Sequence, residues 1–282
     1  MNNIIEVKKS DDFSTSKSKK IIEVHNLVKK FDKFTAVNDI SFNVKEGEIF
    51  AFLGPNGAGK TTTIKMLTTL LHSTSGEIKI NGFSPMTQKD AVRHSFGIVF
   101  QDPSLDDELT AYENMEFHAV LYHVKTEIRK ERIEELLKLV ELWDRKNNKV
   151  KTFSGGMKRR LEIARGLIHH PKILFLDEPT IGLDPQTRNF LWNYIKEMNK
   201  KEKMTVFLTT HYMDEAERIA DRIVIIDHGK IIKIGTGNEI KKSTKTKTLE
   251  EAFLKVTGHS IREETASARE IMKNHPMAGG RR

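Results

Sequence analysis

The stretch IFAFLGPNGAGKTTTIKML, residues 49–67, decides the fold of this 282-residue chain. Its first part is a continuous apolar run of the kind that forms a strand buried on both faces. The octet GPNGAGKT at 54–61 follows directly and matches the pattern G-x-x-x-x-G-K-[ST]. After it, Ile64, Leu67 and Leu71 share one face of a predicted helix. A strand, a glycine turn and a helix N-terminus in this order predict a phosphate-binding loop.

The predicted loop carries the groups that a bound nucleotide needs. Its glycines let the backbone turn tightly, so that successive N–H groups point toward phosphate oxygens. Lys60 is placed to reach the β- and γ-phosphates, and the hydroxyl of Thr61 to ligate Mg²⁺. A plain glycine turn with a solvated lysine could share these letters, but the strand and helix around it favour nucleotide binding. The predicted nucleotide-binding residues are Gly54, Pro55, Asn56, Gly57, Ala58, Gly59, Lys60, Thr61 and Thr62.

Two acids end a second apolar run, ILFLDE at 173–178. In phosphoryl transfer, an aspartate at the end of a buried strand holds Mg²⁺ directly or through water, and this predicts Asp177 as a metal ligand. Glu178 stands one residue further and is placed to polarise the attacking water. A solvated acidic turn before Pro179 is the alternative, and it carries little weight after a phosphate loop.

A second glycine turn occurs in FSGGMKRR at 153–160. Ser154, Gly155 and Gly156 precede a helical run, so they predict another anion site at a helix N-terminus. One γ-phosphate needs only one such cradle from its own subunit, which suggests that the second serves the nucleotide of another subunit. The basic run at 158–160 is expected to be a solvated helix face beside that site.

Outward from these motifs, strands alternate with helices. Apolar runs predict strands at 21–31, 36–44, 49–54, 96–102, 172–179, 205–211 and 222–235, and helices near 187–200 and 214–220. This alternation predicts an α/β fold of the P-loop NTPase class, in which helices flank a mostly parallel sheet. An all-helical insert is expected at about 102–160, where Ile133, Leu136, Leu137 and Val140 form an apolar stripe.

Composition excludes several classes of protein. The chain has no cysteine, which rules out a disulfide scaffold, an iron–sulfur cluster and a thiol nucleophile. The net charge of +8 lies at the ends of the chain: residues 1–20 carry +2 and residues 241–282 carry +5. Residues 21–240 carry only +1, so we expect no basic groove and no nucleic-acid partner.

Taken in order, these motifs resemble the nucleotide-binding subunit of an ATP-binding-cassette (ABC) transporter, over about residues 21–235. The loop at 54–61 stands at the Walker A position, ILFLDE at Walker B and FSGGM at the signature motif. The resemblance implies an antiparallel β subdomain and an inserted α-helical subdomain beside the parallel core. Outside this range, we expect residues 1–20 to form a mobile leader and residues 236–282 a basic C-terminal extension.

The same resemblance assigns roles to residues outside the two glycine turns. Phe31 stands where the family stacks an aromatic ring on adenine, and Asp184 of GLDP lies in the D-loop. Gln101 is the Q-loop glutamine, which senses the γ-phosphate and Mg²⁺, and His211 is the switch histidine that contacts the γ-phosphate. Two positions depart from the common pattern: Met157 replaces glutamine in the signature, and Phe31 replaces tyrosine.

The family also implies a mechanism and partners. Two chains would form a homodimer, or one chain a heterodimer with a second ATPase subunit, around two MgATP. The hydroxyl of Ser154 and the N–H of Gly156 would complete the γ-phosphate cage of the partner. When the two chains close around ATP, the insert would pass this movement to a membrane-spanning permease subunit. This partner places the protein in the cytoplasm, peripheral on the inner face of the cell membrane.

The residues around the motifs narrow the resemblance to one group of ABC ATPases. The segments at 34–42, 99–115 and 152–188 and the tail TLEEAFLKVTG look like daunorubicin-type multidrug exporter ATPases. This predicts an ATPase that drives efflux of a drug-like or lipid-like substrate. The alternatives are the ATPase of an importer, or a soluble ABC ATPase that acts on ribosomes or DNA.

Overall fold

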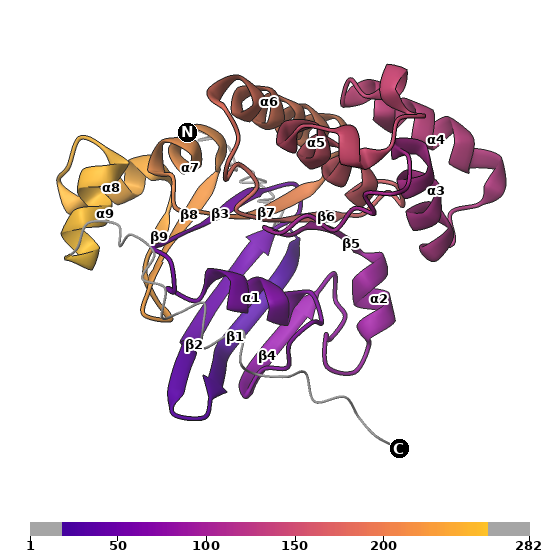
Figure 1. The fold of residues 1–282 in the computed structure, drawn as a ribbon. Coiled ribbons are helices and arrows are strands. Elements are labelled where there is room, and N and C mark those ends of the chain that lie inside the picture. Colours follow the sequence, from indigo (N-terminus) through magenta and orange to yellow (C-terminus); the bar gives the residue numbers. More distant parts are fainter. Residues whose placement is uncertain (1–18, 259–282) are drawn as a thin grey trace, which may run out of the picture.

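The computed structural model describes residues 19–258. The predicted leader, apart from Lys19 and Lys20, and the last part of the predicted extension lie outside the described residues. Within this range the chain forms two sheets with helices on both sides of the larger one (Figure 1).

The larger sheet has six strands in the order β5-β6-β7-β3-β8-β9. All neighbours in it are parallel except β9, which is antiparallel to β8. The bounds are β3 Ile49–Leu53, β5 Phe96–Val99, β6 Ile173–Asp177, β7 Thr205–Thr210, β8 Arg222–Asp227 and β9 Lys230–Gly235. The predicted α/β fold with a mostly parallel sheet is therefore confirmed.

The smaller sheet is antiparallel and has the order β2-β1-β4. Its strands are β1 Lys20–Phe31, β2 Phe34–Lys45 and β4 Ser75–Ile80. This sheet and the helix α1 (Lys60–Leu67) lie on one face of the larger sheet, with α2 (Lys89–His94) beside them (Figure 1). It is the antiparallel β subdomain that the resemblance implied.

The other face of the larger sheet is covered by helices (Figure 1). Those over the sheet are α5 Gly155–Gly166, α6 Pro185–Glu202 and α7 Met213–Ile219. The insert lies beside them and contains α3 Ala111–Leu121, α4 Thr126–Leu139 and the 3₁₀ turns Trp143–Arg145 and Val150–Thr152. The predicted apolar stripe of the insert is buried, as expected for core residues.

Two hydrophobic cores form because side chains alternate along the buried strands. In β3, Phe50 and Phe52 face the antiparallel sheet and contact the ring of Phe42 in β2 and that of Phe207 in the neighbouring strand β7. Ala51 and Leu53 face the helices on the opposite side. An apolar residue at every position of a strand thus supplies both cores.

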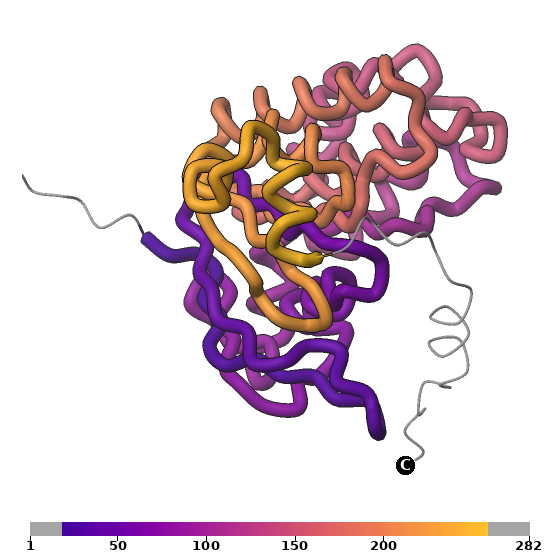
Figure 2. The backbone as a smooth tube through the Cα atoms, turned by 90° about the vertical axis from the view of Figure 1, so that its left-hand side faces the viewer, coloured from indigo at the N-terminus to yellow at the C-terminus, as the bar shows by residue number. Residues whose placement is uncertain are grey.

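The C-terminal part of the described chain is packed against the body. Residues expected to form an appended extension instead build α8 (Gly237–Thr244) and α9 (Leu249–Thr257), beside α7 and β9 (Figure 2). Ile240, Leu249, Ala252 and Phe253 are buried in the same core as the strands. The boundary expected after residue 235 therefore does not coincide with the end of the folded core. Between residues 19 and 258 no helix is long and apolar enough to cross a membrane.

Phe253 and Leu254 allow a direct test of that packing. Phe253 is 1% exposed and its neighbour Leu254 is 40% exposed. We expect Phe253→Ala to lower the free energy of unfolding by about 3–5 kcal/mol, because it opens a cavity in the core. Leu254→Ala should change it by less than about 0.5 kcal/mol. Urea unfolding of both variants measures the difference, and equal small losses would contradict the packing of α9.

Candidate functional site

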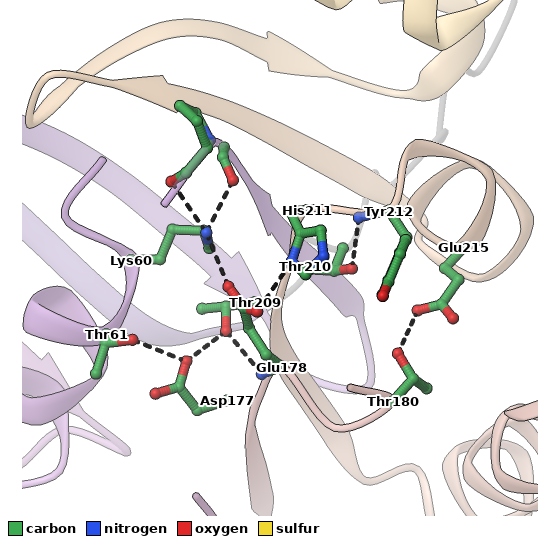
Figure 3. Close-up of polar contacts among 12 residues, drawn as sticks. Lys60, Thr61, Asp177, Glu178, Thr180, Thr209, Thr210, His211, Tyr212 and Glu215 are labelled. Atoms are coloured by element: carbon green, nitrogen blue, oxygen red, sulfur yellow. Dashed lines mark hydrogen bonds and ion pairs between the residues drawn. The ribbon is translucent and has the colours of Figure 1, made fainter. Parts of the chain in front are cut away.

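The site lies where three neighbouring parallel strands end. The strand β3 runs into the loop at 54–59, β6 ends in Asp177 and Glu178, and β7 ends before His211. The carboxyl ends of parallel strands meet at one edge of a sheet, which is where α/β folds bind ligands. Figure 3 shows these side chains pointing toward one another.

Lys60 is the buried cation at the centre of this cluster. It is 4% exposed. Its Nζ donates to the carbonyl oxygens of Gly54 at 2.8 Å and Pro55 at 3.1 Å. The same Nζ lies 2.9 Å from Oε1 of Glu178, which is 6% exposed. The ammonium group is thus held between its own loop and the acid at the end of β6.

Gly59 is required at the start of α1 for two reasons. Its φ of 105° is left-handed, a conformation that side chains rarely allow. A Cβ built on it would lie 2.6 Å from the carbonyl oxygen of Ala36. The loop therefore turns closely against β2. As at any helix N-terminus, the N–H groups of the first turn of α1 have no partner within the helix.

Asp177 lies between two hydroxyl groups. Its Oδ1 accepts from Thr209 Oγ1 at 2.6 Å and from Thr61 Oγ1 at 3.2 Å. Burial raises the pKa of the Asp177 carboxyl, while these two hydrogen bonds oppose the shift. Carboxylate and hydroxyl oxygens side by side are the hard ligands that Mg²⁺ prefers, so the pair fits the predicted metal site.

Glu178 is held as a carboxylate by its neighbours. Burial favours its neutral form, but the hydrogen bond from His211 and the charge of Lys60 outweigh burial and lower the pKa of Glu178 to about 2. His211 Nδ1 lies 2.9 Å from Glu178 Oε2, opposite Lys60 (Figure 3). The Glu178 backbone is left-handed, with φ of 48°, and its N–H donates to Thr209 Oγ1 at 3.0 Å. The arrangement presents an ionised carboxylate at the mouth of the loop.

Two other predicted residues stand apart from this cluster. Gln101 follows β5 and is exposed, and within residues 19–258 it makes no hydrogen bond to Thr61 or Asp177. Phe31 is half-buried at the end of β1. The Nζ of Lys29 lies 4.8 Å from the centre of its ring, a cation–π contact within the chain.

The second glycine turn lies on the far side of the sheet from α1 (Figure 1). Ser154 caps α5 and accepts from the N–H of Met157 at 3.3 Å. A Cβ on Gly156 would lie 2.9 Å from Thr187, whose hydroxyl donates to Asp184 at 2.6 Å. Ser154 and Asp184 therefore belong to adjacent helix N-termini. Among the described residues, no hydrogen bond or ion pair joins this turn to the loop at 54–62.

Sequence reasoning missed two residues that shape the site. Thr209 bridges Asp177 and the backbone of Glu178, and no motif pointed to its hydroxyl. Arg159 was expected on a solvated helix face, and this prediction was wrong because its side chain is 7% exposed. Its guanidinium donates to the carbonyl oxygens of Asp177, Glu178 and Pro179. Nothing in the sequence of the basic run at 158–160 indicates which of its three side chains is buried.

Comparisons with known proteins agree with this geometry. The family model described as ABC transporter matches residues 37–181. The chain is 43% identical over 220 residues to the linearmycin resistance ATP-binding protein LnrL of Bacillus subtilis, covering 78% of this chain and 70% of that protein. It is 42% identical over 222 residues to the daunorubicin/doxorubicin resistance ATP-binding protein DrrA of Streptomyces peucetius, covering 79% and 67%.

Solved structures give the same result. An ATP-binding subunit of an ABC transporter superposes with a TM-score of 0.77 at 30% identity, covering 84% of this chain and 99% of that one. A dimeric ATP-binding cassette bound to ADP and Pi, in a post-hydrolysis state, superposes with a TM-score of 0.70 at 30% identity, covering 76% and 98%. The resemblance drawn from the motifs, the fold and the prediction of an ATP-hydrolysing enzyme are confirmed.

Thr209 and Thr205 test whether the bridging hydroxyl serves the reaction. Thr209→Val removes the donor to Asp177 and one of the two acceptors of the Glu178 N–H, so we expect ATP turnover to fall by about tenfold or more. Thr205 lies at the opposite end of β7, where its Oγ1 accepts from Gly47 N–H at 2.9 Å. Thr205→Val should lower the free energy of unfolding by a similar amount, about 1–3 kcal/mol, and leave ATP turnover unchanged. Similar turnover in the two variants, per folded molecule, would contradict the role of Thr209.

Proposed function

This chain belongs to the ABC transporter family and is an ATP-hydrolysing subunit of a transporter, and from that premise we propose that it drives export of a drug-like or lipid-like substrate. In this proposal two subunits close around two MgATP and act through a separate membrane-spanning permease. The observation that carries the proposed ATP hydrolysis is the cluster of Lys60, Glu178 and His211 beside Thr61 and Asp177. The proposed export rests on the relatives named for drug resistance and for export. We assign the ATPase unit to about residues 21–235, with α8 and α9 packed onto it.

Hydrolysis would be carried by Glu178 with the groups around it. Lys60 binds the β- and γ-phosphates in this assignment, and its Nζ lies 2.9 Å from the Glu178 carboxylate. The γ-phosphate would therefore come next to an ionised carboxylate, which can accept a hydrogen bond from the attacking water and orient it. His211, bound to the second oxygen of Glu178, keeps the carboxylate in place and contacts the γ-phosphate in turn.

Thr61 and Asp177 are the residues that would hold Mg²⁺, with Gln101 as the third proposed ligand. The oxygen atoms of Thr61 and Asp177 already lie 3.2 Å apart. Bound there, the ion would offset negative charge on the β- and γ-phosphate oxygens. The loop residues 54–62 would surround the phosphates with N–H groups, and Phe31 would stack on the adenine ring.

The position of the second glycine turn supports the proposed dimer. Ser154, Gly155 and Gly156 lie across the sheet from α1, and Asp184 caps the next helix beside them (Figure 1). We assign this surface to the nucleotide of a partner subunit, identical or homologous. The dimeric cassette among the structural relatives supports this arrangement.

The insert carries the surface that we assign to the permease. Phe117 and Leu121 on α3 are 61% and 56% exposed, and Val120 and Ile128 are also exposed. Large apolar side chains gathered on one exposed part of a protein mark an interaction site. The subunit would then sit on the cytoplasmic face of the membrane. Two relatives named for drug resistance and one named as a Nod factor export protein favour export over import.

Replacing Glu178 tests the assignment of the reaction. We expect Glu178→Gln to bind ATP and to turn it over at least about a hundredfold more slowly, as when a group acting mainly on the transition state is lost, about 2.7–4 kcal/mol. The exposed Glu197 on α6 provides a control, and Glu197→Gln should hydrolyse ATP normally. Phosphate release and ATP binding measure both steps. Near-normal turnover in Glu178→Gln would overturn this role.

Mixing two inactive variants tests the shared site. Ser154→Arg damages the turn offered to the partner, and Lys60→Ala damages the phosphate loop. A dimer with one chain of each kind retains one intact composite site, so we expect ATPase activity to reappear on mixing. The activity of the mixture against the sum of the separate variants is the measurement. If the mixture never exceeds that sum, each chain completes its own site.

A further inference from the structure

Arg159 sits on α5 behind the catalytic edge of the sheet, and its guanidinium contacts two separate backbone segments. On one side Nε donates to Pro179 O at 2.7 Å, and Nη2 donates to Asp177 O and Glu178 O, each at 3.3 Å. On the other side Nη1 donates to Phe100 O, the carbonyl directly before Gln101. One buried side chain therefore touches the backbone next to both residues proposed to act on the γ-phosphate.

The backbone at Glu178 has a reason to need this support. Its φ of 48° is left-handed, which is strained for a residue with a long side chain. Such a conformation persists only where the surroundings determine it. The three successive carbonyl oxygens of 177–179 all accept from one planar guanidinium, which holds the peptide groups on both sides of the Glu178 Cα.

The same helix face holds the segment that contains Gln101. Glu162 is 1% exposed and accepts from Arg159 at 3.1 Å and from Ser104 N–H at 2.7 Å. Arg165 donates to Ser104 O at 2.7 Å and also to its hydroxyl. Glu162 lies three residues from each arginine on α5, so it neighbours both of them on the helix surface. They attach both ends of the segment 100–104 to the helix that begins at Ser154.

We propose that Arg159 is a positioning residue for ATP hydrolysis. Its guanidinium orients the Glu178 carboxylate through the backbone of 177–179 and, through Phe100 and Glu162, ties the Gln101 segment to the same helix. This rests on the proposed role of Glu178. Arginine is required because a planar fork with five donors serves four carbonyls and a carboxylate at once, whereas the ammonium of a lysine has three donors at one point.

Arg159→Lys in the full chain is the test, with Arg160→Lys as the matched control. Arg160 is the next residue on the helix, and it points elsewhere, to Val140 O at 3.0 Å and to Glu141 at 3.1 Å. We expect Arg159→Lys to lower kcat by about tenfold or more and to leave KM and the ATP dissociation constant within about twofold. Arg160→Lys should keep the wild-type kcat. Counting active molecules by bound ATP corrects for any loss of folded protein.

Glu162→Gln keeps the proposal testable if Arg159→Lys folds poorly. It preserves shape and removes the charge that anchors the guanidinium, so we expect a smaller fall in kcat at unchanged KM. A wild-type kcat per active molecule in both variants, or a rise in KM alone, would overturn the proposal.

A double variant separates this inference from the proposed function. If Arg159 acts through Glu178, adding Arg159→Lys to Glu178→Gln should slow the residual hydrolysis by less than about twofold. A full additional loss would show that Arg159 does not act through Glu178 and would overturn the main part of the proposal, leaving only its contact with the Gln101 segment. Normal turnover in Glu178→Gln alone would overturn the role of Glu178 instead, whatever Arg159→Lys does.

Discussion

The ion pair between Lys60 and Glu178 is the contact on which the site depends. Both side chains are almost fully buried, and removing two charges from water costs more than their attraction returns unless further hydrogen bonds satisfy them. Lys60 finds these in Gly54 and Pro55, and Glu178 finds one in His211. The pair therefore joins the loop after β3 to the end of β6, and His211 adds the end of β7. A shift of β3 or β6 would leave a buried charge unpaired.

The two-sided core explains how a sheet can keep those strand ends so closely aligned. All residues of β3, β6 and β7 are buried, and alternate side chains enter different cores. A slip of one residue would exchange every side chain between the two cores. These strands supply the rings of Phe50, Phe52, Phe175 and Phe207 to one core and only aliphatic side chains to the other, so the exchange would not fit.

The sequence predicted the parts of the site that follow from strand ends, and not those that follow from tertiary contacts. Asp177 and Glu178 end one buried strand, Lys60 follows another strand after a short glycine loop, and parallel strands bring such ends together. His211 was identified through the resemblance to the family. Arg159 could not be separated from its basic neighbours, since the carbonyls that bury it lie on other elements. The helices α8 and α9 did have local signals, the capping boxes that begin at Thr236 and Thr248, which the basic composition of the segment obscured.

Through Arg159, the helix α5 connects the second glycine turn at its N-terminus to the backbone of Glu178. Ser154 caps the helix on the surface assigned to the partner, and Arg159 follows five residues later, about 7.5 Å along the axis. A helix is stiff over so short a distance, so a partner nucleotide bound at Ser154 would fix the guanidinium that supports Glu178. The two halves of a composite site would then be coupled within each chain. Closure of the dimer would then act on the proposed catalytic carboxylate through the Arg159 guanidinium and the backbone carbonyls that it contacts.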